Sequence, residues 1–175
     1  MTQPFDIRPE TEADVSGLYA LSALAFGPGR FARSAYRVRE GVAPVSALSL
    51  TAWAADDRAY ASAAQLVGGV RFTAIRVGEQ EGGLLLGPLV VHPDLKGKGC
   101  GQALVTEGLA RARESGFAFV FLVGDMSYYE RFGFAPLAPG KITLPGPVDP
   151  ARLLVVELEK GALGDVTGQI VAHAP

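Results

Sequence analysis

The clearest pattern in the chain is an apolar run at positions 84–91, followed by a glycine-rich turn and an amphipathic stretch. An apolar run of this length is typical of a buried strand. After the turn, apolar and small residues recur every three or four positions, as on one face of a helix: Gly101, Leu104, Val105, Gly108, Leu109 and Ala112. The pattern predicts a strand, a tight turn and a helix that ends at Gly116.

Alternating or apolar stretches predict three strands before this centre, at 5–8, 48–54 and 66–77. In the third, Val70, Phe72 and Ala74 would share one face, and Arg71, Thr73 and Ile75 the other. The polar residues 78–83 predict a hairpin connection. The strand at 66–77 should therefore be antiparallel to the central strand.

Helix signals surround the first strands. Thr11 followed by Asp14 resembles a capping box, the three- and four-residue apolar steps after it predict a helix, and Gly27 ends the pattern. A shorter helix is expected over 32–40. After the central helix, the apolar run 117–123 predicts a buried strand parallel to the central one through a right-handed crossover. A short helix at 125–130 and strands at 142–144, 153–158 and 166–172 complete the prediction.

Composition agrees with one soluble domain. The 175 residues are 49% hydrophobic, and neither an interdomain linker nor a repeat interrupts the patterns, so we expect a single α/β domain over 1–175. The first residues lack the basic and apolar regions of a secretory signal, and no apolar run reaches 18 residues, which favours a cytoplasmic protein without a membrane partner. One cysteine excludes an internal disulfide. A net charge of −2 without a broad basic face argues against nucleic acid.

The turn before the central helix carries the candidate chemistry. Backbone N–H groups of residues 97–101, with the helix dipole and the charges of Lys96 and Lys98, would suit a pyrophosphate. The alternative is a turn that only lets the helix pack close to the sheet. Gln102 or Leu104 stands where a dinucleotide fingerprint needs its third glycine, and His92 stands where a P-loop needs its first.

Two motifs resemble those of the GNAT superfamily of N-acetyltransferases. The first is residues 89–93 with the turn Lys96-Gly97-Lys98-Gly99-Cys100-Gly101, which is similar to the acetyl-CoA-binding motif after a strand ending in Val-x-Pro. The second is Tyr129, four residues before Gly133-Phe134. Gly124-Asp125 and residues 157–168 further resemble a largely uncharacterised bacterial branch. Lys96 departs from the usual Gln or Arg, and Asp125 from a frequent Asn.

The resemblance implies a fold and a cofactor. It implies a mixed, mostly antiparallel sheet flanked by helices, whose central parallel pair splays at a β-bulge, here at Gly87-Pro88. Acetyl-CoA would enter the gap, with no metal. Leu89 and Val91 would offer backbone groups to its pantetheine, and the N–H of Val90 or Val91 would polarise the thioester carbonyl.

The resemblance also implies catalytic roles. Tyr129 would be the general acid, because a neutral phenol with a pKa of about 10 can protonate a thiolate leaving group. Tyr128 is interpreted as a packing residue. His92 is chemically suitable as a base. Histidine is common before this proline in the family, however, so its presence does not indicate a catalytic role, and the base stays unassigned. Cys100 is interpreted as a small packing residue, because these enzymes transfer the acetyl group directly.

The expected function is therefore transfer of acetyl from acetyl-CoA to a primary amine in a ternary complex, by a monomer or homodimer. Two alternatives stay open: an acyl-CoA-binding sensor without turnover, and an acyltransferase with a longer acyl group. The acceptor would be chosen by the first two helices and the loop 145–150. The basic cluster between Arg30 and Arg39 would suit an acidic acceptor, or else is a solvated helix face.

Overall fold

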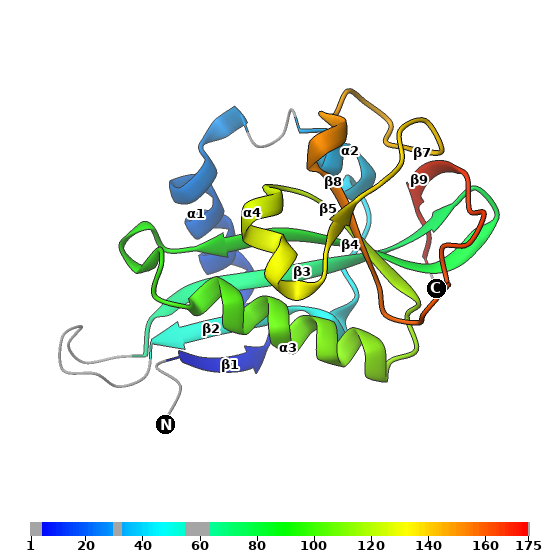
Figure 1. Cartoon of the computed structure of the whole chain (residues 1–175). Coiled ribbons are helices and arrows are strands. Elements are labelled where there is room, and N and C mark those ends of the chain that lie inside the picture. The colour runs from blue at the N-terminus through cyan, green and yellow to red at the C-terminus, as the bar shows by residue number, and fades with distance from the viewer. Residues whose placement is uncertain (1–4, 30–32, 55–63, 175) are drawn as a thin grey trace.

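The computed structural model describes residues 5–29, 33–54 and 64–174, which form one mixed sheet with helices on both faces (Figure 1). Its strands are β1 (Phe5–Pro9), β2 (Leu50–Ala54), β3 (Leu66–Val77), β4 (Gln80–Val91), β5 (Phe119–Val123), β6 (Ala135–Pro136), β7 (Ile142–Thr143), β8 (Leu153–Glu157) and β9 (Gly168–Ala172). The helices are α1 (Val15–Phe26), α2 (Ser34–Arg39), α3 (Cys100–Glu114) and α4 (Met126–Tyr129).

The strand order β1-β2-β3-β4-β5-β8-β6 is antiparallel except for the central pair of β4 and β5. A second branch adds β9 antiparallel to β3 and the two-residue β7 parallel to β9. The mixed, mostly antiparallel α/β fold expected from the sequence is confirmed. The β7–β9 contact was not predicted.

The central parallel pair is short and then opens. β4 and β5 pair from Gly83 opposite Phe119 to Leu85 opposite Phe121. On the other side of β4, the register against β3 shifts so that Leu86 faces Phe72 and Leu89 faces Val70, which leaves one extra residue in β4. The predicted bulge at Gly87-Pro88 is thus present, and beyond it β4 continues along β3 without β5.

Helices cover the two faces of the sheet through different residues of β3. A Cβ on Gly108 of α3 would meet the buried Phe72 ring at 2.6 Å, whereas a Cβ on Gly69 would meet Leu18 of α1 at 2.4 Å. All six residues of the predicted apolar stripe of α3 are buried. The split of β3 into two faces is also confirmed, since Phe72 belongs to the core cluster under α3 and Ile75 to a second, separate cluster.

Several boundaries differ from the prediction. β4 begins at Gln80, so the connection expected over 78–83 is a tight turn at Gly78 and Glu79. Residues 46–48 form a 3-10 turn before β2, because Ser49 and Leu48 donate backbone hydrogen bonds to Val45. The second helix is confined to Ser34–Arg39, and Ala32 lies outside the described residues.

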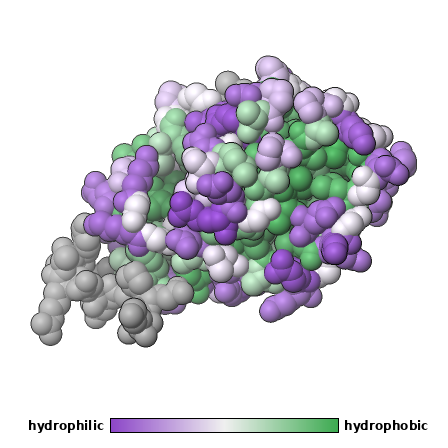
Figure 2. Space-filling model, in the orientation of Figure 1, coloured by the Kyte–Doolittle hydropathy of each residue, from purple (hydrophilic) through white to green (hydrophobic). Residues whose placement is uncertain are grey.

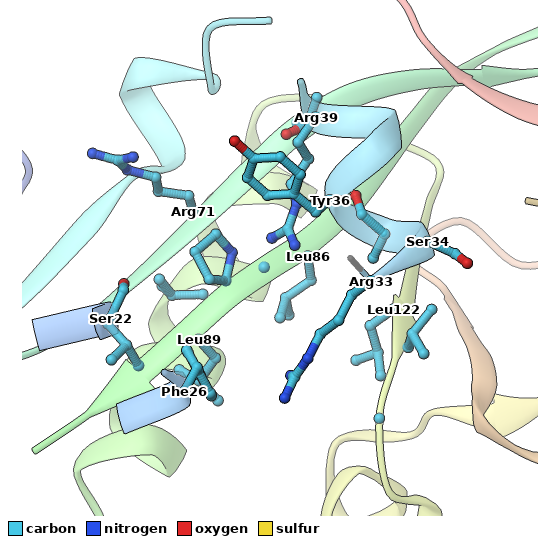
Figure 3. Close-up of a pocket in the computed structure, with 18 of the residues that line it drawn as sticks. Ser22, Phe26, Arg33, Ser34, Tyr36, Arg39, Arg71, Leu86, Leu89 and Leu122 are labelled. Carbon is cyan, nitrogen blue, oxygen red and sulfur yellow. Dashed lines mark hydrogen bonds between the residues drawn. The ribbon is translucent and has the colours of Figure 1, made fainter. Parts of the chain in front are cut away.

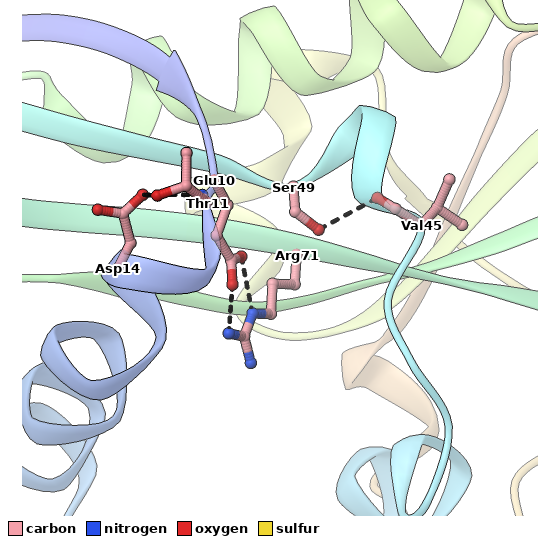
Figure 4. A network of polar contacts seen from close by, with 6 residues as sticks. All are labelled: Glu10, Thr11, Asp14, Val45, Ser49 and Arg71. Carbon is pink, nitrogen blue, oxygen red and sulfur yellow. Dashed lines mark hydrogen bonds and ion pairs between the residues drawn. The ribbon is translucent and has the colours of Figure 1, made fainter.

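The start of α1 follows the predicted capping box. The backbone N–H and the hydroxyl of Thr11 each donate to the Asp14 carboxylate at 2.8 Å (Figure 4). The space-filling view shows charged and polar residues interrupting apolar ones across the face seen in Figure 1 (Figure 2). Among the described residues, no helix is long and apolar enough to cross a membrane.

Candidate active site

The turn before α3 presents its backbone to solvent. Gly97 and Gly99 have φ angles of 77° and 88°, a left-handed conformation that favours glycine, and a Cβ on either would meet nothing within 4 Å. The N–H of Lys98 donates to Leu95, so it is already used. The first bond of the helix runs from Ala103 to Gly99. The N–H groups of residues 100–102 therefore precede the helical ladder and can bind an anion at the positive end of the dipole.

The strand β4 offers a second row of donors beyond its bulge. The N–H of His92 donates to Val67 of β3 at 2.8 Å. Because successive N–H groups of a strand point to opposite sides, the N–H of Val90 also points to β3. Those of Leu89 and Val91 point into the gap that β5 has left.

Tyr129 lies at the end of α4, beside the carboxyl end of β5. Its ring packs over Gly124, where a Cβ would approach it within 2.5 Å, and meets the ring of Phe134 edge-on at 5.8 Å between centroids. Burial raises the pKa of the Tyr129 phenol, and the nearby Tyr128 and Asp125 raise it further. The phenol is therefore neutral over the physiological pH range and can act as a proton donor.

Tyr128 reaches a part of the site that its sequence context did not indicate. Its hydroxyl lies against the first turn of α3, 2.7 Å from the position of a Cβ on Gly101. Its ring meets Tyr129 edge-on at 4.9 Å and carries the Arg131 guanidinium 5.0 Å from its centroid. Two adjacent tyrosines on one short helix cannot be assigned from spacing alone, because either can face the neighbouring helix.

A cavity of about 750 Å³ joins the splayed strands to α1 and α2 (Figure 3). Its lining includes the β4 segment from Leu86 to Val90, the end of β5, and both tyrosines. The opposite wall comes from α1 and α2, with Ser22, Phe26, Arg33, Tyr36 and Arg39. Of the predicted cofactor residues, Leu89 and Val90 line this cavity, and the turn at 96–101 lies outside its lining, at the start of α3.

The two other candidate groups have structural roles. The Nδ1 atom of His92 accepts a hydrogen bond from the Asp94 N–H at 3.3 Å, so it caps a 3-10 turn, and His92 does not line the cavity. Cys100 is 1% exposed, and burial raises the pKa of its thiol to about 11. Within the described ranges, no group of three or more His, Cys, Asp or Glu side chains could hold a metal ion.

Comparisons with known proteins agree with this geometry. Residues 24–134 match the model of the Acetyltransferase (GNAT) family. The uncharacterized N-acetyltransferase YhbS of Escherichia coli K12 is 32% identical over 168 residues, which are 95% of each chain. The uncharacterized N-acetyltransferase YjhQ of the same strain is 34% identical over 133 residues, covering 74% of this chain and 69% of YjhQ.

Two solved structures with ligands are similar. Escherichia coli YhbS in complex with CoA has a TM-score of 0.80 and 28% identity, covering 99% of this chain and 92% of that one. A GNAT family acetyltransferase from Brucella melitensis in complex with acetyl-CoA has a TM-score of 0.64 and 28% identity, covering 99% and 98%. With the splayed pair and the glycine turn, these matches establish that the chain belongs to the GNAT acetyltransferase family.

Proposed function

We propose that this protein transfers an acetyl group from acetyl-CoA to a primary amine by direct attack within a ternary complex. The observation that carries the proposal is the gap between β4 and β5, which opens beyond Leu85 and leads into the cavity beside Tyr129. A thioester in this gap would have the acceptor wall of α1 and α2 on one side. The α3 turn would lie on the other.

The cofactor would be held mainly by backbone groups. Its pyrophosphate would bind the turn from Gly97 to Gly101, where free N–H groups and the helix dipole favour anions. Lys96 and Lys98 would add charge, and Lys96 would do so without the bidentate contact of an arginine. The pantetheine arm would run along β4, between the Leu89 and Val91 N–H groups.

The same alternation of N–H groups supports one oxyanion donor over its neighbour. Leu89 and Val91 face the gap, whereas Val90 faces β3. Of the two that face the gap, Leu89 lines the cavity and Val91 does not, so the thioester carbonyl would accept from Leu89 rather than from Val90 or Val91. A donor fixed in the backbone stabilises the developing negative charge without reorganisation. Val90 also lines the cavity, but its N–H points to β3 and would not reach the thioester carbonyl.

The chemical step uses Tyr129 as the acid. The neutral amine nitrogen forms a bond to the thioester carbon, the carbon–sulfur bond breaks, and the thiolate takes the phenolic proton of Tyr129. The extra proton of the attacking nitrogen leaves to water, and water returns a proton to the Tyr129 phenolate, which restores the acid for the next cycle. Because burial keeps Tyr129 protonated, the acid is available wherever the acceptor amine is neutral.

The experiment is release of free CoA from acetyl-CoA across a panel of small amines, amino acids, peptide N-termini and lysine peptides. We expect turnover with at least one acceptor and a rise in melting temperature on adding CoA. Stabilisation by acetyl-CoA with no turnover across the panel would indicate an acyl-CoA sensor instead. Absence of stabilisation by CoA would contradict both.

A further inference from the structure

Arg39 is the one cavity residue with a buried polar atom that nothing in the described part of the chain satisfies. Its Nε donates to the carbonyl of Ala35 at 3.2 Å, but Nη1 is fully enclosed without a hydrogen-bond partner among those residues. Nη1 lies against β4 at the bulge, 2.8 Å from the position of a Cβ on Gly87. A charged donor is thus aimed at the point where the central strands part (Figure 3).

The charges around Arg39 leave it without compensation. Arg71 is held by Glu10, with contacts of 2.9 Å and 2.5 Å from its Nε and Nη2 (Figure 4), so its charge is already paired. Arg33 lies over the Phe26 ring, 5.2 Å from its centroid, and adds to the positive potential. Burial first, and then Arg33, lower the pKa of Arg39 to about 10, so it is still a cation at neutral pH.

The acidic side chains that line the cavity have other partners than Arg39. Asp125 pairs with Arg152 at 3.3 Å, and Asp149 accepts the Ala151 N–H at 3.0 Å. A desolvated cation in a cavity is costly unless an anion meets it, and a planar guanidinium binds a carboxylate best.

We propose that the acceptor amine carries a carboxylate, and that Arg39 binds this carboxylate at the α2 end of the cavity. The inference rests on the proposed function and names the class of its acceptor. Gly87 and Leu89 are two residues apart on β4, a separation of about 7 Å. The carboxylate and the reacting nitrogen should therefore lie within about 7 Å of each other, as in a free amino acid.

The test compares acceptors that differ only in this charge: an amino acid, its carboxamide and the corresponding decarboxylated amine. We expect kcat/KM to be about 30-fold or more higher for the carboxylate. Arg39→Gln should abolish that preference, and Arg39→Lys should retain part of it. Arg37→Gln is the matched control, because Arg37 is on the same helix but exposed and outside the cavity lining.

A binding measurement separates this inference from the proposed function. Titration of the same amino acid into the CoA complex should show saturable heat in the wild type and in Arg37→Gln, but not in Arg39→Gln, whether or not turnover occurs. The CoA-induced rise in melting temperature should be the same in all three proteins, which verifies the fold.

Two results would overturn the inference. One is equal kcat/KM for carboxylate and carboxamide, unchanged by Arg39→Gln. The other is a preference for an acyl-CoA whose acyl group ends in a carboxylate, lost in Arg39→Gln, because Arg39 would then bind the acyl donor rather than the acceptor. Total absence of turnover with retained, Arg39-dependent amino acid binding would contradict only the proposed function.

Discussion

The hydroxyl of Tyr128 lies against Gly101, so that a methyl group on Gly101 would come within 2.7 Å of the phenolic oxygen. The same methyl group would also approach the side chains of Val91 at 3.5 Å and Leu89 at 3.7 Å. This point, where α3 begins and β4 ends, is the place at which the pyrophosphate and pantetheine of CoA would meet. Gly101 would therefore keep open a space that the proposed ligand occupies.

Gly101→Ala should weaken CoA binding while leaving the fold intact. The added methyl group would displace the Tyr128 hydroxyl and would stand beside the side chains of Val91 and Leu89, where the ligand is proposed to pass. We expect the dissociation constant for CoA to rise at least about tenfold, or about 1.4 kcal/mol, in calorimetric titration. The melting temperature without ligand should change little, because alanine is the better helix former and Tyr128 is a movable side chain.

Gly29→Ala is the control for this substitution, because a Cβ there meets nothing within 4 Å and Gly29 does not line the cavity. It should bind CoA as the wild type does. An unchanged CoA affinity in Gly101→Ala would show that the ligand does not pass between α3 and β4 at this position.

Cys100 should be inert in the folded protein and should make stability depend on alkaline pH. Its thiol has a pKa near 9.0 when unfolded and about 11 when folded, so the unfolded chain loses its proton first. Below pH 9 the thiol is protonated in both states, and the free energy of unfolding is at its full value. As the pH rises from 9 to 11, the free energy of unfolding falls by about 2–3 kcal/mol. Urea denaturation of the wild type and Cys100→Ala between pH 8 and 11 measures the difference.

Alkylation tests the burial of the Cys100 thiol independently. At pH 8.5, iodoacetamide should modify Cys100 readily in urea and negligibly in the native protein, as followed by mass spectrometry. Rapid modification of the native thiol would mean that the start of α3 is more open than its 1% exposure indicates.

The profile of kcat/KM against pH should show no fall near neutral pH caused by loss of the Tyr129 proton. Because the pKa of Tyr129 is raised above the ordinary value of about 10, the acid stays protonated as the acceptor amine becomes neutral. The expected profile of kcat/KM rises with pH and then forms a plateau up to about pH 10. A fall between pH 8 and 9.5 that vanishes in Tyr129→Phe would contradict the burial-raised pKa.

The elements and their faces could be predicted because their signals are local. The alternation through Phe72 and the three- and four-residue steps through Leu104 each describe one element. The splay at Gly87 could be expected from the proline and glycine within an apolar run, together with the family resemblance. β7 and β9 form a parallel contact of two residue pairs, which no local pattern encodes.

The acceptor end of the site could be predicted only in outline. The arginines between positions 30 and 39 look alike in the sequence, but Arg39 is enclosed because it meets Gly87, Arg37 is exposed, and Arg30 lies outside the described residues. Likewise, the spacing to Gly133-Phe134 led us to predict Tyr129 as the acid, but it gave no indication that Tyr128 would reach Gly101. Both relationships depend on tertiary contacts between segments far apart in the chain.

Steady-state kinetics of Tyr129→Phe show whether Tyr129 is the acid in acetyl transfer. The phenylalanine ring keeps the packing over Gly124 and against Phe134 and removes only the proton donor. We expect kcat to fall about 10²- to 10⁴-fold with CoA affinity unchanged, while Tyr128→Phe keeps kcat within about threefold of the wild type. Retention of the wild-type kcat in Tyr129→Phe would show that Tyr129 is not the acid.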